Sequence, residues 1–352
     1  MPSFFARAIL KAGFGLSAAL LVLLSFASSG LAETRVGGTI SGEETWDKSG
    51  SPYIVYQDII IPEGAKLNIT PGTTVRFKPN IADQSGVNQF DLEILVHGEL
   101  FVEGAPEDSV YFTSDASKPT WQDWQGIVVK GENAKASIYG AHLEFCSMGV
   151  RIEGGVVDIT SSTIQGCHLY GVYAISGTAN LDTVYMTTIG NTGGTGIGVW
   201  GDGGAIINIT NSFLIGVQSG VSFSRGSTGT ISFSVVSLCV RNGVIVRNSN
   251  PTIHHTSISG NEYGLIISAG AAPTIYDNNL FNNGIADLWI RDYRKEVAKV
   301  DVSKNFWGTT DLAEIEERVL DAVDNPDEKG YAVVEPFLNE AAITDAAFVE
   351  KK

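Results

Sequence analysis

The 352-residue sequence has few positively charged residues and no long apolar run beyond its first 32 residues, and each shortage excludes a class of protein. Lysine and arginine total 23 against 39 aspartates and glutamates, which gives a formal net charge of -16. A surface this acidic argues against nucleic acid or an anionic membrane as a partner. Without a second long apolar run, no membrane span is expected. Helical periodicity is almost absent from residues 33–308, which argues against a helical fold.

The first 32 residues have the features of an export signal. Arg7 and Lys11 form a basic start, residues 16–26 are apolar but too short to span a bilayer, and Gly30-Leu31-Ala32 supplies small residues for cleavage. The residue directly after that point is Glu33 and not a cysteine, so a lipid anchor is not indicated. We therefore expect a signal peptide at 1–32 and an exported mature chain of net charge -18. The periplasm, the medium and the cell surface all stay open as its location.

The strongest pattern in the sequence is a period near 22 residues. Apolar residues five apart recur, and the first members of successive pairs are separated by 21, 22, 28, 22, 22, 22 and 27 residues. The pairs are Ile138/Leu143, Ile159/Ile164, Leu181/Met186, Ile209/Leu214, Ile231/Val236, Ile253/Ile258, Ile275/Leu280 and Val302/Trp307. A glycine ladder runs in phase, at Gly149-Val150, Gly171-Val172, Gly196-Ile197, Gly220-Val221, Gly243-Val244 and Gly264-Leu265. Such a period is typical of a solenoid, and units made of strand and turn predict parallel strands with inward ladders of like side chains.

The three cysteines fall at one position of this period. Cys146, Cys167 and Cys239 each follow the first apolar anchor of their repeat by eight residues. Stacked residues hold their Cβ atoms about 4.8 Å apart, which is beyond the usual disulfide range. A ladder of buried thiols is therefore favoured. A Cys146–Cys167 disulfide in an oxidising compartment is the alternative.

Short motifs at both ends of the periodic region resemble a known architecture. The opening coils carry Pro62-Glu63-Gly64, Phe112-Thr113-Ser114 and Trp124-Gln125-Gly126-Ile127, and Asn305-Phe306-Trp307-Gly308 closes the series. This order resembles secreted bacterial right-handed parallel β-helix repeat proteins of the pectate-lyase-like superfamily, over roughly residues 37–338. The resemblance implies an all-β, right-handed parallel β-helix solenoid of about ten coils at residues 33–308. It implies no specific enzyme family, because the same fold carries lyases, hydrolases, epimerases, adhesins and non-enzymatic surface proteins.

Residues 309–352 depart from the period. The apolar residues Leu312, Ile315, Val319, Leu320 and Val323 follow helical spacing, and Asp311 with Glu314 forms a capping box. We predict a short C-terminal α-helical cap of about a dozen residues that covers the open end of the stack. A short strand at 331–334 and an acidic tail follow.

Projecting the glycine ladder outward predicts two rows of side chains on one strand face. The first row is Arg151, Tyr173, Gly198, Ser222, Ile245, Ile266 and Trp289, and the second is Glu153, Ile175, Trp200, Ser224, Arg247, Ser268 and Arg291. Flat aromatic faces beside polar groups suit sugars. The candidate glycan-binding residues are therefore Tyr173, Trp200, Arg247, Trp289 and Arg291. The alternative is an apolar strip that a loop or the C-terminal helix covers.

Metal and cofactor sites are not evident in the sequence. The carboxylates of Asp158, Asp182, Asp202 and Asp277 fall on different rows, so neither a Ca²⁺ site nor a pair for hydrolysis is predicted, and no cofactor is expected. His255 and Asp277 hold one position in successive coils and are the candidate ligands for a transition metal. Because neighbouring side chains of a strand alternate, His254 is expected to point away from His255. The Ser, Thr and Asn residues at 162, 212, 234, 256, 278 and 305 are predicted to form a turn ladder that satisfies backbone groups.

These observations favour an exported, non-catalytic β-helix scaffold that binds a polysaccharide or a cell-surface protein. The alternative is a polysaccharide lyase or epimerase that acts on uronate glycans. Its site would lie on the face with Arg225, Arg247 and Arg291, where a basic side chain would abstract the proton next to the uronate carboxylate.

Overall fold

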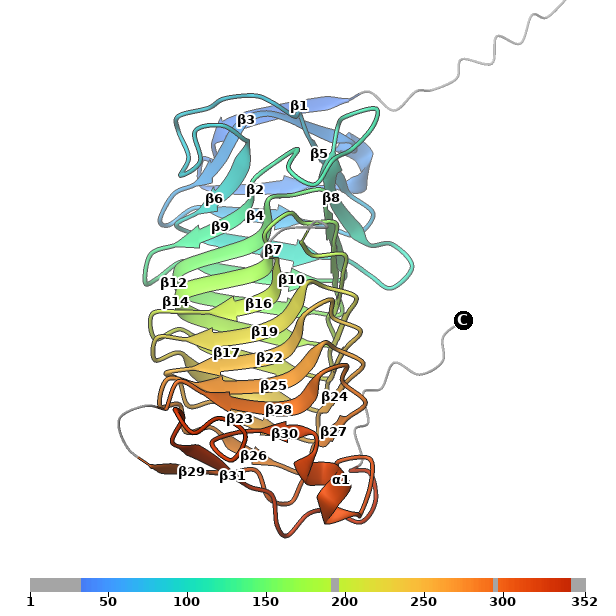
Figure 1. Cartoon of the computed structure of the whole chain (residues 1–352). Helices are drawn as coiled ribbons and strands as arrows, with labels where there is room; N and C mark the ends of the chain where they lie inside the picture. The colour runs from blue at the N-terminus through green and yellow to red at the C-terminus, as the bar shows by residue number, and fades with distance from the viewer. Residues whose placement is uncertain (1–32, 191–195, 294–296, 343–352) are drawn as a thin grey trace, which may run out of the picture. The chain divides into compact units, whose positions relative to one another are not determined.

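The computed structural model describes residues 33–190, 196–293 and 297–342, and in it the chain winds through successive coils that stack parallel strands on three faces (Figure 1). The predicted signal peptide at 1–32 and the last residues of the tail lie outside the described residues. No helix in the described part of the chain is long and apolar enough to cross a membrane. The all-β solenoid predicted from the period is confirmed.

Each face is a ladder of short parallel strands. Most coils give one strand to a face, and the long strands β3, β12 and β14 each continue from one face to the next. Face 1 contains β1 (Thr34–Thr39), β3 (Tyr53–Ile61), β6 (Glu93–Val96), β9 (Gly126–Lys130), β12 (Met148–Thr160), β14 (Tyr170–Asp182), β16 (Ile197–Gly201), β19 (Ser219–Ser224), β22 (Asn242–Arg247), β25 (Tyr263–Ser268), β28 (Ala286–Arg291) and β30 (Val319–Leu320). Face 2 contains β2 (Glu43–Trp46), β4 (Lys66–Ile69), β7 (Glu99–Glu103), β10 (Lys135–Tyr139), the second halves of β12 and β14, β17 (Ile206–Thr210), β20 (Thr228–Ser232), β23 (Thr252–His254) and β26 (Thr274–Tyr276). Face 3 contains the first half of β3, β5 (Thr74–Phe77), β8 (Val110–Ser114), β11 (Ala141–Glu144), β13 (Thr163–Gln165), β15 (Tyr185–Thr187), β18 (Phe213–Ile215), β21 (Val235–Ser237), β24 (Ser257–Ser259) and β27 (Asn279–Phe281).

The predicted apolar ladders form the core between the three faces. On face 2 the paired residues are Ile138, Ile159, Leu181, Ile209, Ile231, Ile253 and Ile275, and on face 3 they are Leu143, Ile164, Met186, Leu214, Val236, Ile258 and Leu280. All of these side chains are buried. Because one residue of slip would turn each ladder outward, this burial fixes the register of the whole stack.

The predicted polar ladder at the turn between faces 2 and 3 is also confirmed. Asn305 Oδ1 accepts the backbone N–H of Asn278 at 2.9 Å, and Asn278 Oδ1 accepts that of Thr256 at 3.0 Å. Ser234 and Ser212 continue the series with the same kind of bond. Each of these four side chains thus satisfies a buried backbone donor in the preceding coil, which would otherwise destabilise the turn, whereas Thr256 donates to the carbonyl of His254.

The three cysteines are buried free thiols at the same turn position, as the ladder interpretation predicts. Cys146 Sγ and Cys167 Sγ lie 2.6 Å apart, closer than two unbonded sulfur atoms pack, so the disulfide alternative for this pair stays open. Cys239 belongs to a later coil, where its backbone N–H donates to Asn261 Oδ1. Burial raises the pKa of Cys146 well above the usual thiol value and that of Cys239 to about 12.

We expect the native protein to be inert to a thiol-reactive dye at neutral pH, because the thiolate is the reactive species and burial suppresses it. After denaturation without a reductant, all three thiols should react. A count of one thiol under those conditions would contradict the thiol ladder and support a Cys146–Cys167 disulfide.

The C-terminal segment differs from the predicted cap. The α-helix α1 (Leu312–Glu316) is short, and the next apolar pair forms β30, which pairs with β28 at the end of face 1. The dozen-residue helix was therefore wrong, and Val323 is exposed. Only half of the capping box forms: Asp311 accepts the N–H of Ala313 at 2.9 Å, whereas Glu314 accepts the hydroxyl of Thr309.

The strand predicted near the end of the chain exists. It is β31 (Gly330–Val333), which pairs with β29 (Ala298–Asp301) in a separate two-stranded sheet. A single 3-10 turn, η1 (Lys48–Gly50), lies near the other end of the described chain. Figure 1 shows α1, β29 and β31 together beyond the last coils.

Candidate functional site

The candidate glycan-binding residues lie in the outward rows of face 1. In the coil of β16 the strand register differs by two residues from the prediction. The glycine that continues the ladder after Gly171 is Gly198, because a Cβ at Gly171 would lie 2.6 Å from the Gly198 carbonyl oxygen. The proposed rung at Gly196 was therefore wrong by two residues. Since a shift of two keeps the same side chains outward, the alternation of the sequence could not reveal it.

The corrected register brings two of the candidate residues together. Tyr173 on β14 pairs with Trp200 on β16, in one row instead of two. The second row changes as well, because a β-bulge pairs Glu153 with Ser176 and not with Ile175.

Tyr170, Tyr173 and Trp200 form a continuous aromatic surface, called here the first aromatic patch. The rings of Tyr173 and Trp200 are stacked with centroids 4.7 Å apart and planes 22° apart. Tyr170 lies against both, at 4.9 Å from Tyr173 and 5.3 Å from Trp200. All three side chains are half-buried, so the patch keeps an exposed face.

Charged side chains surround the first aromatic patch. Arg151, on the strand before Tyr173, forms an ion pair with Glu153, and Lys130 approaches Glu153 at 3.1 Å. Arg225 reaches back over one coil to Asp202, whose side chain is fully buried. Two guanidinium groups, each paired with a carboxylate, therefore belong to the coils on either side of Tyr173 and Trp200.

The pKa of the Tyr173 hydroxyl depends on these charges. Burial and then the carboxylate of Asp202 raise the pKa of Tyr173, Glu153 acts in the same direction, and Arg151 and Arg225 oppose them. The phenol of Tyr173 is therefore protonated at neutral pH and can donate a hydrogen bond or a proton.

A second aromatic patch lies further along face 1, where Trp289 of β28 stacks on Tyr263 of β25 at 5.0 Å. The Arg291 guanidinium lies over the Trp289 ring, 4.4 Å from its centroid. Four strand spacings separate Trp200 from Trp289, or about 19 Å. Arg247 is exposed two coils before Arg291 and belongs to neither patch. Apart from Arg247, the predicted site residues thus divide into two patches of one face.

A buried acidic pair, which the sequence did not reveal, lies at the N-terminal end of face 1. Asp58 of β3 and Glu93 of β6 are fully buried, and Asp58 Oδ1 accepts the backbone N–H of Glu93 at 3.0 Å. The Glu93 carboxylate accepts the backbone N–H groups of Val87 and Asn88. Burial, and next the carboxylate of Asp58, raise the pKa of Glu93 to about 7, against the bonds from the loop and the charge of Arg151. The pair fastens the loop between β5 and β6 to the stack.

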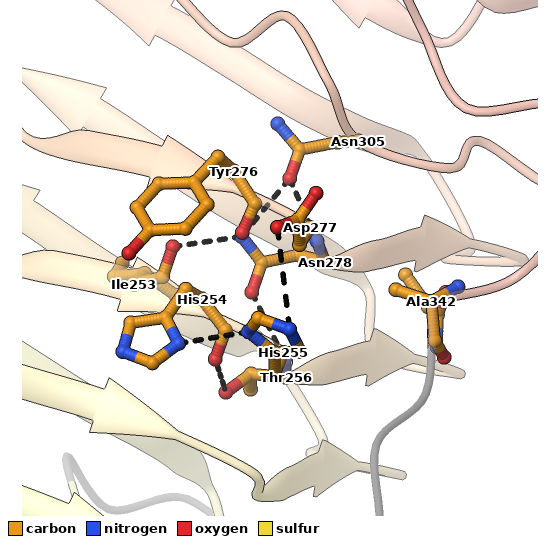
Figure 2. A network of polar contacts seen from close by, with 10 residues as sticks. Ile253, His254, His255, Thr256, Tyr276, Asp277, Asn278, Asn305 and Ala342 are labelled. Carbon is orange, nitrogen blue, oxygen red and sulfur yellow. Dashed lines mark hydrogen bonds and ion pairs between the residues drawn. The ribbon is translucent and has the colours of Figure 1, made fainter.

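The histidine cluster is at the turn between β23 and β24, and here the predicted geometry was wrong. His255 has a backbone φ of 49°, so its side chain does not alternate with that of His254, and the two Nδ1 atoms lie 2.9 Å apart. Figure 2 shows the two imidazole rings turned toward each other, with Asp277 beyond His255 and Tyr276 beside His254. The left-handed conformation recurs at this turn position, at Ser161, Thr183, Asn211, Phe233, His255, Asp277 and Lys304, with φ between 47° and 59°.

Comparisons with known proteins agree with the fold. Residues 148–306 match the family model described as a right handed beta helix region, and residues 38–193 match the model described as a pectate-lyase like beta helix domain. The chain belongs to the right-handed parallel β-helix proteins of the pectate-lyase-like superfamily. No curated protein matches the sequence significantly.

Among solved structures, the chain is similar to variants of the periplasmic alginate epimerase AlgG. A double-substitution variant matches with a TM-score of 0.52 and 12% identity, over 86% of this chain and 77% of that one. A single-substitution variant matches with a TM-score of 0.50 and 11% identity, over 87% and 75%. At this identity the likeness concerns the fold alone.

Proposed function

We propose that this chain is an exported protein that modifies a uronate polysaccharide on face 1, by epimerisation or by elimination. The observation that carries the proposal is the first aromatic patch, in which a protonated Tyr173 stacks on Trp200, with Arg151 on the coil before it and Arg225 two coils after it. The fold is shared with proteins named as alginate epimerases, which act on a uronate polymer. That likeness supports the substrate class and supplies no residue correspondence.

The patch suits a sugar acid. The exposed faces of Tyr173 and Trp200 can pack against the apolar C–H face of a pyranose ring. Arg151 and Arg225 can bind its carboxylate, since a guanidinium presents two parallel N–H donors to a carboxylate. Pairing with Glu153 and Asp202 fixes the position of both guanidinium groups before a substrate arrives.

The same groups supply the parts of a reaction at the carbon next to the carboxylate. Neutralising the uronate carboxylate stabilises the enolate that forms when the C–H bond breaks. In this scheme the carboxylate of Glu153 accepts the proton and the electron pair moves into the enolate. In epimerisation, Tyr173 then protonates the carbon from the other face. In elimination, the electron pair expels the glycosidic oxygen, which takes the proton of Tyr173.

A second candidate function, binding without reaction, is favoured by one specific observation. Both arginines of the patch are already paired with carboxylates, so their charge is compensated in the free protein. Face 1 would then hold a glycan mainly through its aromatic side chains and release it unchanged.

The experiment is incubation of the protein with alginate and with polygalacturonate, each with and without Ca²⁺. Elimination is followed by the ultraviolet absorbance of the unsaturated product, and epimerisation by deuterium uptake from D₂O at the ring carbon. We expect turnover of a uronate polymer, and we expect Tyr173→Phe to lower it at least about 100-fold while binding is retained. The matched control is Tyr185→Phe, because Tyr185 is an exposed tyrosine of face 3.

The results separate the two candidates. Binding that Trp200→Ala abolishes, without turnover of any polymer, would support binding alone. Neither binding nor turnover, in protein with an intact fold by circular dichroism, would overturn both proposals.

A further inference from the structure

We propose that His254 and His255 bind one divalent transition-metal ion through their Nδ1 atoms, at the turn between β23 and β24. This site is on the edge between faces 2 and 3 and is independent of the glycan face. The metal classes that fit are Cu²⁺ and Ni²⁺, which favour imidazole nitrogen and tetragonal geometry.

The distance between the two nitrogens carries the proposal. The Nδ1 atoms of His254 and His255 lie 2.9 Å apart, where one ring donates a hydrogen bond to the other, and the ring planes are nearly perpendicular at 89°. A bound metal ion would replace the shared proton, which leaves to solvent. Two nitrogens at about 2.05 Å from one ion, and 90° apart around it, are about 2.9 Å from each other. A tetrahedral ion would need a separation of about 3.3 Å. The spacing therefore matches neighbouring positions of a tetragonal ion.

The two rings are held in place by packing, so little has to be rearranged when a metal binds. His254 stacks on Tyr276 with centroids 5.3 Å apart and planes 9° apart. His255 stacks on Phe233 at 4.8 Å, and Phe233 also meets the edge of His254. Because both histidines are already ordered, binding costs little side-chain entropy.

The backbone beneath the pair is fixed as well. Thr256 Oγ1 donates to the carbonyl of His254 at 3.0 Å, and the N–H of Thr256 donates to Asn278 Oδ1 at 3.0 Å, as Figure 2 shows. Asn305 secures Asn278 in the same way at 2.9 Å. The polar ladder thus sets the turn in which φ of His255 is left-handed and the two side chains converge.

Asp277 completes the arrangement from outside. Its Oδ2 lies 4.0 Å from Nε2 of His255. This is too far for a hydrogen bond, so the carboxylate adds negative charge beside the pair without fixing the ring. Within the described residues no three metal-ligating side chains converge on one point. The proposed ion therefore has two protein ligands, and water completes its coordination.

The test is titration of the untagged protein with Cu²⁺ and with Ni²⁺ by calorimetry, together with His254→Asn, His255→Asn and the double variant. Asparagine is chosen because it tolerates the left-handed backbone of residue 255. Replacing a residue that only orients a metal ligand lowers metal affinity about 10- to 100-fold. Removing His254 or His255, which would bind the metal directly, should therefore lower the affinity at least about tenfold. The double variant should bind no more tightly than either single variant, because one loss breaks the chelate and the second removes the remaining ligand.

The matched control is His142→Asn, since His142 is a half-buried histidine of face 3 that stacks on Tyr111. It should leave the affinity unchanged. In wild-type protein, substoichiometric Cu²⁺ should broaden the imidazole NMR signals of His254 and His255 before those of the other three histidines. Unchanged affinity in either single variant, or earlier broadening at another histidine, would overturn the proposal.

Discussion

Replacing Ile253 by alanine should lower the free energy of unfolding by about 2–5 kcal/mol. Ile253 is fully buried on β23, between Ile231 and Ile275 of the neighbouring coils. Truncation removes apolar contact with both neighbours and leaves a cavity that the stacked backbone cannot close. Because each coil contacts only its neighbours, the two interfaces of this coil should weaken together.

The matched control is Ile206→Ala, the same chemical change on the outward side of face 2. Ile206 on β17 is 43% exposed, so its loss should cost less than about 1 kcal/mol. Denaturant titration of both variants measures the difference. Equal losses at the two positions would show that the inward and outward sides of the strands are misassigned.

Glu93 should make the protein less stable as the pH rises from about 4.5 to about 7. Its pKa is raised from the ordinary 4.5 to about 7, chiefly by burial and next by the charge of Asp58. The folded protein therefore holds this proton more tightly than the unfolded chain. The stability that the proton provides is complete below about 4.5 and is lost as the pH passes 7. A difference of about 2.5 pKa units corresponds to about 3 kcal/mol.

The variant Glu93→Gln isolates this effect from all other titrations. Glutamine has nearly the same shape and can still accept one backbone bond from the loop, but it carries no charge. Relative to wild type, the variant should gain up to about 3 kcal/mol between pH 4 and pH 8. The other charged groups around the buried pair are Asp58, Asp83 and Arg151. All three are present in both the variant and the wild-type protein.

The control for Glu93→Gln is Glu99→Gln, a partly exposed glutamate of β7 beside Lys66. Its difference from wild type should hardly change with pH, since exposed ion pairs contribute little. If the stability difference of Glu93→Gln were flat across the same range, the buried carboxylate would not be protonated as described.

The inward ladders could be predicted because burial repeats in every coil. Ile159, Leu181 and Ile209 are stacked neighbours as the period required. The position of Trp200 could not be predicted in the same way. Twenty-seven residues separate Tyr173 from its partner Trp200, against 22 between Arg151 and Tyr173, and a displacement of two residues leaves the inward and outward pattern unchanged.

Two other features, the strand β30 and the buried acidic pair, were not predicted from the sequence, for different physical reasons. Val319 and Leu320 fit a helical spacing, but the free edge of β28 offers unpaired backbone groups, and pairing with it makes them a strand. Asp58 and Glu93 were missed because they precede the periodic region. Glu93 stands opposite Gly126, at the head of the glycine column. The sequence signal that could have identified this buried carboxylate was an acidic residue at the position that later coils fill with glycine.

The turn at which seven residues share a left-handed φ has a consequence for engineering. Its residues are Ser161, Thr183, Asn211, Phe233, His255, Asp277 and Lys304, so hydroxyl, amide, aromatic, imidazole, carboxylate and ammonium groups all occur on the same backbone. The fold does not select the chemistry of this column, because the neighbouring polar ladder holds the turn whatever side chain it carries. New functional groups can therefore be introduced by substitution at this turn position, one coil at a time. Their spacing would be set in advance at about 4.8 Å per coil.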